Sequence, residues 1–159
     1  ANQHTIKAYG ALALSLSSQT PSAQTYIKGS TAMEMLRVNL TADSGEDINV
    51  TSITFDLYRD GAAAAASGDL TNVKLLKSDG TQLGSTVSSP TTEASFSLNL
   101  TVPASETVTL KVLADIPTST GATTTHTNVT NAADLTSTGL SSSADITETG
   151  FVVTGKPWP

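Results

Sequence analysis

The stretch ASFSLNLTV, residues 94–102, alternates strictly between apolar and polar side chains. Its apolar members share one parity: Ala94, Phe96, Leu98, Leu100 and Val102. Successive side chains of a β-strand point to opposite faces, so the pattern predicts a strand with one buried and one solvated side. No segment of the chain shows a comparable 3.6-residue period, and we therefore expect an all-β fold.

Further strands are expected on both sides of this one. Short apolar alternations bounded by turn residues occupy residues 6–17, 32–42, 48–58, 70–77, 81–87 and 108–114. Less regular extended pieces are expected at 24–28, around 128–135 and at 151–154, with a loop at 61–68. The parity of the apolar residues switches between Met35 and Leu36 and again near Thr51, which predicts a β-bulge at each place. Asp79 and Gly80 predict a tight hairpin turn.

Composition supports the same fold class. The 159 residues include 27 Thr and 20 Ser but only 14% charged residues, and branched Thr, Val and Ile favour strands. This length suits one domain, 1–159, with its own core. About eight or nine short strands separated by turns predict an antiparallel β-sandwich, with a barrel as the related alternative.

Charge and cysteine content exclude several classes of protein. Fourteen acidic residues outnumber eight basic ones, giving a net charge of −6, and no basic cluster is present. We therefore expect no nucleic-acid partner. No apolar run reaches the ~18 residues of a membrane helix, so no membrane insertion is expected. The absence of Cys excludes disulfides and thiolate zinc sites. The acidic, Ser/Thr-rich composition is typical of secreted, extracellular proteins.

Three stretches carry a resemblance to a known class of domain. GALALSLSSQTPSAQTYIKGSTAMEMLRVNLTADSGEDINVTSITFDLYRDG covers residues 10–61, LTNVKLLKSDGTQLGSTV covers 70–87, and LNLTVPASETVTLKVLADIP covers 98–117. They resemble the immunoglobulin-like β-sandwich repeats of prokaryotic cell-surface proteins, including S-layer-associated proteins and adhesin stalks. The resemblance implies an immunoglobulin-like fold and a role as spacer, stalk unit or assembly module without an active site.

Several residues are candidates for modification or ligand binding. Four Asn-x-Ser/Thr sequons predict N-glycosylation, with ordinary polar-face asparagines as the alternative: Asn39, Asn49, Asn99 and Asn128. An acidic turn offers oxygen ligands for calcium, with solvated turn acids as the more ordinary interpretation: Asp43, Glu46 and Asp47. No cofactor is otherwise expected. His4 and His126 show neither metal-ligand nor triad spacing, and no catalytic motif is present, so we do not expect an enzyme.

The N-terminal residues suggest a mode of assembly. Residues 1–17 form a long first strand that is able to leave its own sandwich and complete the sheet of a neighbour. Its apolar residues would fill pockets there: Ile6, Leu12, Leu14 and Leu16. The tail, residues 155–159, carries Trp158, which would dock on a neighbour or form part of a linker.

These features lead to one functional hypothesis and two alternatives. The first is a structural subunit of a cell-surface filament that polymerises head to tail through its N-terminal strand, with copies of itself as partners. The second is an Ig-like spacer repeat of a larger S-layer or adhesin protein, with neighbouring repeats as partners. The third is a carbohydrate-binding module, with glycans as ligands.

Overall fold

The computed structural model describes residues 2–3, 6, 9–60, 63–151 and 153–155. Within them lie twelve strands and one short 3-10 helix, so the predicted all-β sandwich is confirmed. The nine longer strands are β1 (Leu12–Leu16), β2 (Met33–Ala42), β3 (Ile48–Arg59), β5 (Thr71–Lys77), β6 (Gln82–Val87), β7 (Glu93–Val102), β8 (Thr107–Asp115), β9 (Thr125–Val129) and β10 (Leu135–Gly139). Two-residue strands complete the set: β4 (Ala63–Ala64), β11 (Glu148–Thr149) and β12 (Val153–Thr154). The 3-10 helix η1 is Ala132–Asp134.

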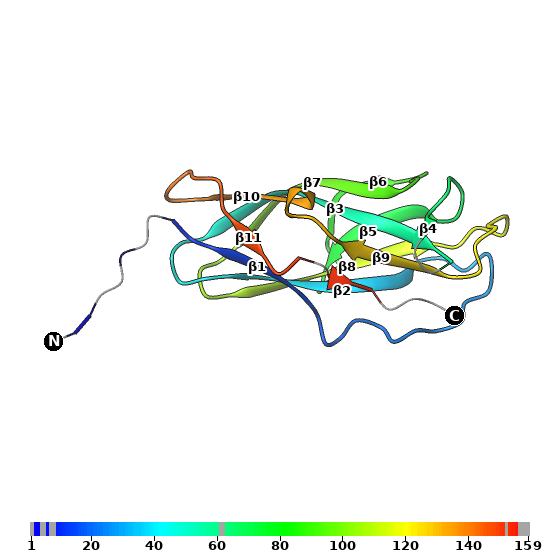
Figure 1. Cartoon of the computed structure of the whole chain (residues 1–159), viewed down its shortest axis with the longest axis horizontal. Helices are drawn as coiled ribbons and strands as arrows, with labels where there is room; N and C mark the ends of the chain where they lie inside the picture. The colour runs from blue at the N-terminus through cyan, green and yellow to red at the C-terminus, as the bar shows by residue number, and fades with distance from the viewer. Residues whose placement is uncertain (1, 4–5, 7–8, 61–62, 152, 156–159) are drawn as a thin grey trace.

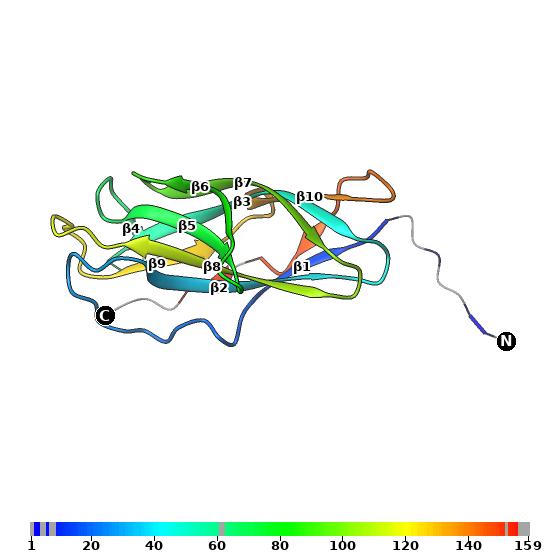
Figure 2. The same cartoon turned by 180° about the vertical axis from the view of Figure 1, so that it is seen from behind.

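The strands form two sheets that face each other (Figures 1 and 2). One sheet has the order β11-β1-β2-β8-β5-β6. The other has the order β10-β3-β9-β12, with β4 and β7 also paired to β3. Nearly all the strand pairs are antiparallel, and the exception is β1 with β11, which run parallel. This exception lies at an edge of the first sheet.

Inward-facing aliphatic side chains of the long strands make the core. In β2, β3, β7 and β8 buried and less buried residues alternate along most of each strand, as the period-2 sequence pattern predicts. Phe55 of β3 and Phe96 of β7 meet edge to face, with ring centroids 6.1 Å apart. The strand expected at 94–102 is β7, and its apolar residues face this core, with Leu98 half-buried against it.

Both predicted bulges and the predicted hairpin are confirmed. The pairing of β2 with β8 passes over Met35, and the pairing of β3 with β10 passes over Thr51, because Thr136 and Ser137 pair with Ser52 and Val50. Each extra residue moves the apolar set of its strand to the other parity, which is the switch visible in the sequence. In the β5–β6 hairpin the N–H of Gly80 donates to the carbonyl of Lys77 at 3.0 Å.

The single irregular strand expected around residues 128–135 is wrong, because two collinear strands take its place. Both β9 and β10 run antiparallel to β3 along the same edge. Between Asn128 and Leu135 the chain advances seven residues while β3 advances three, from Asp56 to Ile53. The four surplus residues loop out around η1. The Asp134 carboxylate accepts the Asn131 N–H there at 2.8 Å and holds the loop closed.

Four other segments also differ from expectation. Residues 24–28 form no strand, because they lie along the loop after β8 and are tied to it by side-chain and turn contacts rather than by a ladder. Among the described residues, the first strand is Leu12–Leu16, and the closing strand expected at 151–154 contains Val153–Thr154. The loop expected at 61–68 contains the short β4, which pairs with the end of β3.

Candidate functional site

The expected assembly strand is divided into two parts by the fold. Leu12 and Leu14 are fully buried in the core of their own chain, where β1 pairs with β2 over its whole length. Leu16, at the end of β1, is 40% exposed. Ile6 is 94% exposed, so it makes almost no contact with the sandwich. Of the four apolar residues expected to fill a partner's pockets, Ile6 is therefore the one most available to a partner.

Glu46 anchors the chain at Gly10. Its carboxylate accepts the Gly10 N–H at 2.9 Å and, from the other side, the N–H groups of Ser141 and Ser142 at 2.8 and 2.9 Å. The Ser142 hydroxyl donates a fourth hydrogen bond at 2.7 Å. These bonds, with that from Gly10 the largest, lower the pKa of Glu46 to about 2. One carboxylate thus joins the start of β1 to the loop that follows β10.

The three acids considered as calcium ligands do not act together. Both oxygens of the Glu46 carboxylate already accept hydrogen bonds from Gly10, Ser141 and Ser142. Asp43 Oδ1 accepts the N–H groups of Ala11 and Gly45 at 3.2 and 2.9 Å. Asp47 Oδ1 accepts the Ala104 N–H at 2.8 Å, in the turn between β7 and β8. Within the described ranges no three Asp, Glu, His or Cys side chains gather into a group suited to a metal ion. The acids stabilise turns by accepting backbone N–H groups.

A closing segment, residues 144–150, bridges the edges of the two sheets next to this anchor. It first runs antiparallel to β10, where Ile146 N–H donates to the Ser137 carbonyl at 3.1 Å. It then turns to β1, and β11 pairs in parallel with Leu12 and Ala13. Figures 1 and 2 both show β11 between β10 and β1. The segment therefore covers the β1 edge that would otherwise be free to pair.

The four sequons occupy different environments. Asn99 is exposed on β7. Asn39 and Asn49 are half-buried, and Asn39 Oδ1 accepts the Thr109 hydroxyl at 2.8 Å. The side chain of Asn128 is buried in β9, which has β3 on one edge and β12 on the other. Glycosylation at Asn128 therefore does not fit the folded chain, whereas the other three remain candidates, with Asn99 the most accessible.

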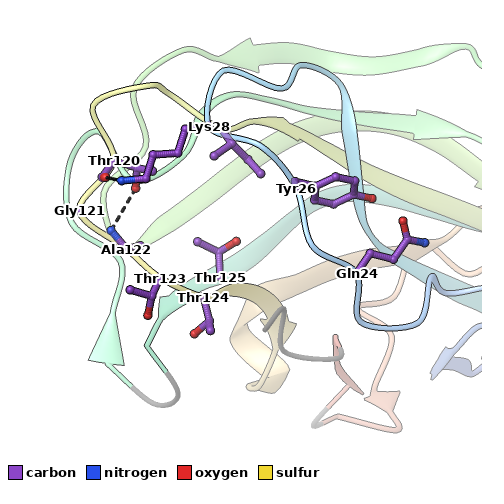
Figure 3. A pocket seen from close by; sticks show the side chains of 10 residues that line it. Gln24, Tyr26, Lys28, Thr120, Gly121, Ala122, Thr123, Thr124 and Thr125 are labelled. Carbon is purple, nitrogen blue, oxygen red and sulfur yellow. Dashed lines mark hydrogen bonds between the residues drawn. The ribbon is translucent and has the colours of Figure 1, made fainter.

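A pocket of about 310 Å³ lies between the 24–28 segment and the loop leading into β9 (Figure 3). Gln24 and Tyr26 form one wall, and residues 120–125 form the other. The Lys28 ammonium donates to the Thr120 carbonyl at 2.7 Å and closes one end. Among the residues that the structure describes, the lining is rich in hydroxyl and amide groups, with Tyr26 as its aromatic ring and no carboxylate. Such a lining suits a neutral ligand with several hydroxyl groups.

Strand β9, with the sequence THTNV, is buried along its whole length although four of its five residues are polar. His126 stacks on Tyr58 of β3, with ring centroids 5.1 Å apart and planes at 9°. Burial lowers the pKa of His126, so the imidazole is neutral near pH 7. Among described side chains, buried atoms without a hydrogen-bond partner include His126 Nδ1, Thr127 Oγ1 and Asn128 Oδ1. Such groups cost free energy, so this part of the sandwich is less well stabilised than the aliphatic core.

Sequence reasoning missed the closing segment and the anchoring role of Glu46. The segment lacks an apolar alternation, since only Ile146 is buried among its first residues. One signal was available in Gly150. Its φ is +87°, and a Cβ there would lie 1.9 Å from the carbonyl oxygen of Leu14, so no other residue fits. Trp158 and the tail beyond residue 155 lie outside the described residues.

Comparison of the chain with models of protein families, with curated proteins and with solved structures found no match. Among the described residues no helix is both long and apolar enough to cross a membrane.

Proposed function

We propose that this chain is a structural, non-enzymatic subunit of an extracellular cell-surface filament, built head to tail by β-strand addition through its N-terminal segment. The observation that carries the proposal is the contrast on either side of Gly10. Ile6 is 94% exposed, whereas Leu12 and Leu14 are buried in β1. An isoleucine that is exposed to solvent, a few residues before a strand fixed in its own sheet, is suited to fill an apolar pocket of a partner.

The anchor supports the same proposal. Glu46 and Asp43 fix Gly10 and Ala11 to the body of the subunit through backbone hydrogen bonds. In the free subunit these bonds hold the start of β1 on its own sandwich, while Ile6 before it is exposed to solvent. The resemblance to repeats of prokaryotic surface proteins supports a location at the cell surface, and the acidic, Ser/Thr-rich composition is consistent with secretion.

The experiment is negative-stain electron microscopy of the 159-residue chain, with light scattering to follow assembly. We expect uniform fibres from the unchanged chain and none from Ile6→Asp, because a charged side chain does not enter an apolar pocket. Ile27→Asp is the matched control, since Ile27 is also strongly exposed, at 82%, but lies outside the N-terminal segment. Monomers of the unchanged chain at every concentration would overturn the filament and favour a spacer repeat of a larger surface protein.

N-glycosylation is proposed as part of the extracellular role. Asn99 is the best acceptor because its side chain is exposed on the outer face of β7. Asn39 and Asn49 would follow only where the enzyme reaches half-buried side chains. Intact mass spectrometry of cell-derived protein, followed by peptide mapping, tests this. Glycan on Asn128 but not on Asn99 would contradict the assignment.

The pocket beside Tyr26 favours one alternative function, a carbohydrate-binding module. Its hydroxyl-rich lining and single aromatic ring are the groups that usually contact sugars. Titration with neutral mono- and oligosaccharides, followed by NMR shifts at residues 120–125, tests this alternative. Tyr26→Ala should abolish binding and Tyr9→Ala, which changes an exposed tyrosine elsewhere, should not. Lack of binding across a broad glycan panel would reject it.

A further inference from the structure

The closing segment is the least firmly paired part of its sheet. It contributes only two residue pairs to β1, through Glu148 and Thr149, whereas β2 contributes five pairs on the opposite edge. The two pairs are parallel, which is the slightly weaker arrangement. On the β10 side the segment depends on the Ile146 N–H, the Ala144 carbonyl and the Glu148 carboxylate, which accepts the Ser137 hydroxyl at 2.7 Å.

The place of the closing segment between β10 and β1 restricts which residues fit there at two points. At the first point an apolar side chain faces the core, and Ile146 fills it with 5% of its surface exposed. Four residues later this place needs glycine, because a Cβ at Gly150 would lie 1.9 Å from the Leu14 carbonyl oxygen. Both requirements are set by the neighbouring strands β10 and β1, and another strand that meets them is able to take the place of this one.

The N-terminal segment repeats the same spacing. Ile6 and Gly10 are four residues apart, as are Ile146 and Gly150, in the sequences IKAYG and ITETG. On the parity between them, Ala8 stands where the closing segment has Glu148. Glu148 is half-buried and accepts the hydroxyl of the buried Ser137, a hydrogen bond that an alanine there does not provide. Ile6 is exposed in its own subunit and would become buried in the new position.

From this correspondence we propose that residues 6–10 of a second copy of this chain displace residues 144–150 and pair with β1 in their place. This inference rests on the proposed function and names the acceptor site for the donor strand. The incoming segment would run parallel to β1, as β11 does. The body of the donor then lies toward the Leu16 end of the acceptor strand, while the acceptor's own donor segment leaves at Gly10. Such a contact is head to tail.

The Glu46 anchor holds both partners of this exchange in the monomer. In the donor, Gly10 must leave its own Glu46 before it takes the place of Gly150 in the acceptor. In the acceptor, the loop that leads into the closing segment is held by hydrogen bonds from the Ser141 and Ser142 N–H groups to the Glu46 carboxylate. Assembly is therefore slow in the unchanged chain, and weakening the anchor accelerates it. The charge-assisted hydrogen bonds to a carboxylate become weaker with a neutral amide.

A disulfide lock tests the displacement directly, because the chain contains no other cysteine. Ala13 and Thr149 are register partners on β1 and β11, both exposed, and Ala13→Cys with Thr149→Cys would fasten the closing segment to β1. We expect complete loss of fibres in the oxidised variant and their return on reduction. Thr41→Cys with Thr107→Cys is the matched control, since it joins β2 to β8, which do not separate.

Two outcomes distinguish this inference from the proposed function. Fibres from the oxidised Ala13–Thr149 variant at the unchanged rate would overturn the displacement and leave the filament proposal standing. Failure of the unchanged chain to form any fibres would overturn both. Glu46→Gln should shorten the lag before fibre growth, and an unchanged or longer lag would contradict the role of the anchor.

A peptide experiment covers the case in which the lock fails to form. A synthetic peptide with the sequence of residues 2–11 is added to the Ile6→Asp protein, which does not donate its own strand. We expect saturable binding and loss of hydrogen-exchange protection at the Ile146 N–H. The same peptide carrying Ile6→Asp should not bind. Binding of the first peptide without any change at Ile146 would place the acceptor elsewhere and overturn the inference.

Discussion

The region of the long strands and the C-terminal region use the same fold in different ways. In β2, β3, β7 and β8, strands of nine to twelve residues pair over most of their length and bury aliphatic side chains. From residue 125 onward the strands have five residues or two, and β9 buries polar side chains, some without partners. Stability is therefore expected to reside in the first region, while the second remains able to exchange its pairing partners.

If the proposed assembly is correct, the long-strand region stabilises the fold and the C-terminal region provides the edge for association. The long-strand region needs no contribution from residues 144–155 to form its own ladders. The C-terminal region completes an edge that an exposed strand would otherwise present to any other chain. Replacement of this cover by a second copy would be controlled association at the same edge.

The largest expected effect comes from breaking the core of the long-strand region. Phe55→Ala removes a fully buried ring that packs edge to face on Phe96, and should lower the free energy of unfolding by about 3–5 kcal/mol. Val153→Ala in β12 should lower it by only about 1.5 kcal/mol, from two lost methyl groups. Urea titrations followed by far-ultraviolet circular dichroism measure both. Equal losses would show that the two regions are not different in stability.

A smaller effect of opposite sign is expected in β9. Thr127 is fully buried and its hydroxyl has no partner, while its register partner is the apolar Leu57. Thr127→Val keeps the shape and removes the unpaired hydroxyl, and should raise the free energy of unfolding by about 1 kcal/mol. Thr109→Val, which removes a hydroxyl bonded to Asn39, is the control and should lower it by about 1 kcal/mol. A loss of stability in both variants would show that Thr127 has a partner in solution.

The same contrast explains how far the sequence was informative. In residues 94–102 every second side chain is apolar and faces the core, so the pattern alone predicts β7. Bulges in β2 and β3 were predictable because an extra residue leaves a visible switch of parity. These are local signals, and they depend on neither the partner strand nor its distance along the chain.

The C-terminal region gave no such signal. In β9 both faces are buried, so Thr, His and Asn carry no alternation to mark the strand. β10 could not be distinguished from β9 in the sequence, because the four surplus residues around η1 interrupt the pairing with β3. β11 could not be predicted from local patterns, because its partners Leu12 and Ala13 lie at the opposite end of the sequence. The role of Glu46 was hidden for the same reason: in the sequence it is one of three acids in a turn. Only the fold brings Gly10 and Ser142 to its carboxylate.

The junction between the two regions should show a characteristic dependence on pH. Hydrogen bonds, first of all from Gly10, lower the pKa of Glu46 from 4.5 to about 2 in the folded chain. A carboxylate whose pKa is lower in the folded than in the unfolded chain stabilises the fold at pH values above the unfolded pKa. This contribution to stability is lost as the pH falls from about 4.5 to about 2. The urea midpoint of the unchanged chain should therefore decline over this range. Glu46→Gln should have a lower midpoint at pH 7 and a shallower decline.

His126 supplies a control within the same titration. Burial lowers its pKa from 6.5, so the folded chain favours the neutral ring and stability falls as the pH drops below about 6.5. The decrease in stability just below pH 6.5 should be retained in Glu46→Gln and absent from His126→Gln. An acid decline between pH 4.5 and 2 that is the same with and without Glu46 would contradict the role of its carboxylate as an anchor.

The smallest effect is expected on the outer face of the long-strand region, where the core does not contribute. Arg37 and Glu34 of β2 form an ion pair, with Nη2 and Oε2 3.0 Å apart and both side chains partly exposed. Water and salt screen such a pair, so Glu34→Gln should lower the free energy of unfolding by at most about 0.5 kcal/mol. The difference should shrink further in 1 M salt, in which the screening length falls to ~3 Å. A loss above 2 kcal/mol that persists at high salt would show that the stability of this region depends on its surface as well as on its aliphatic interior.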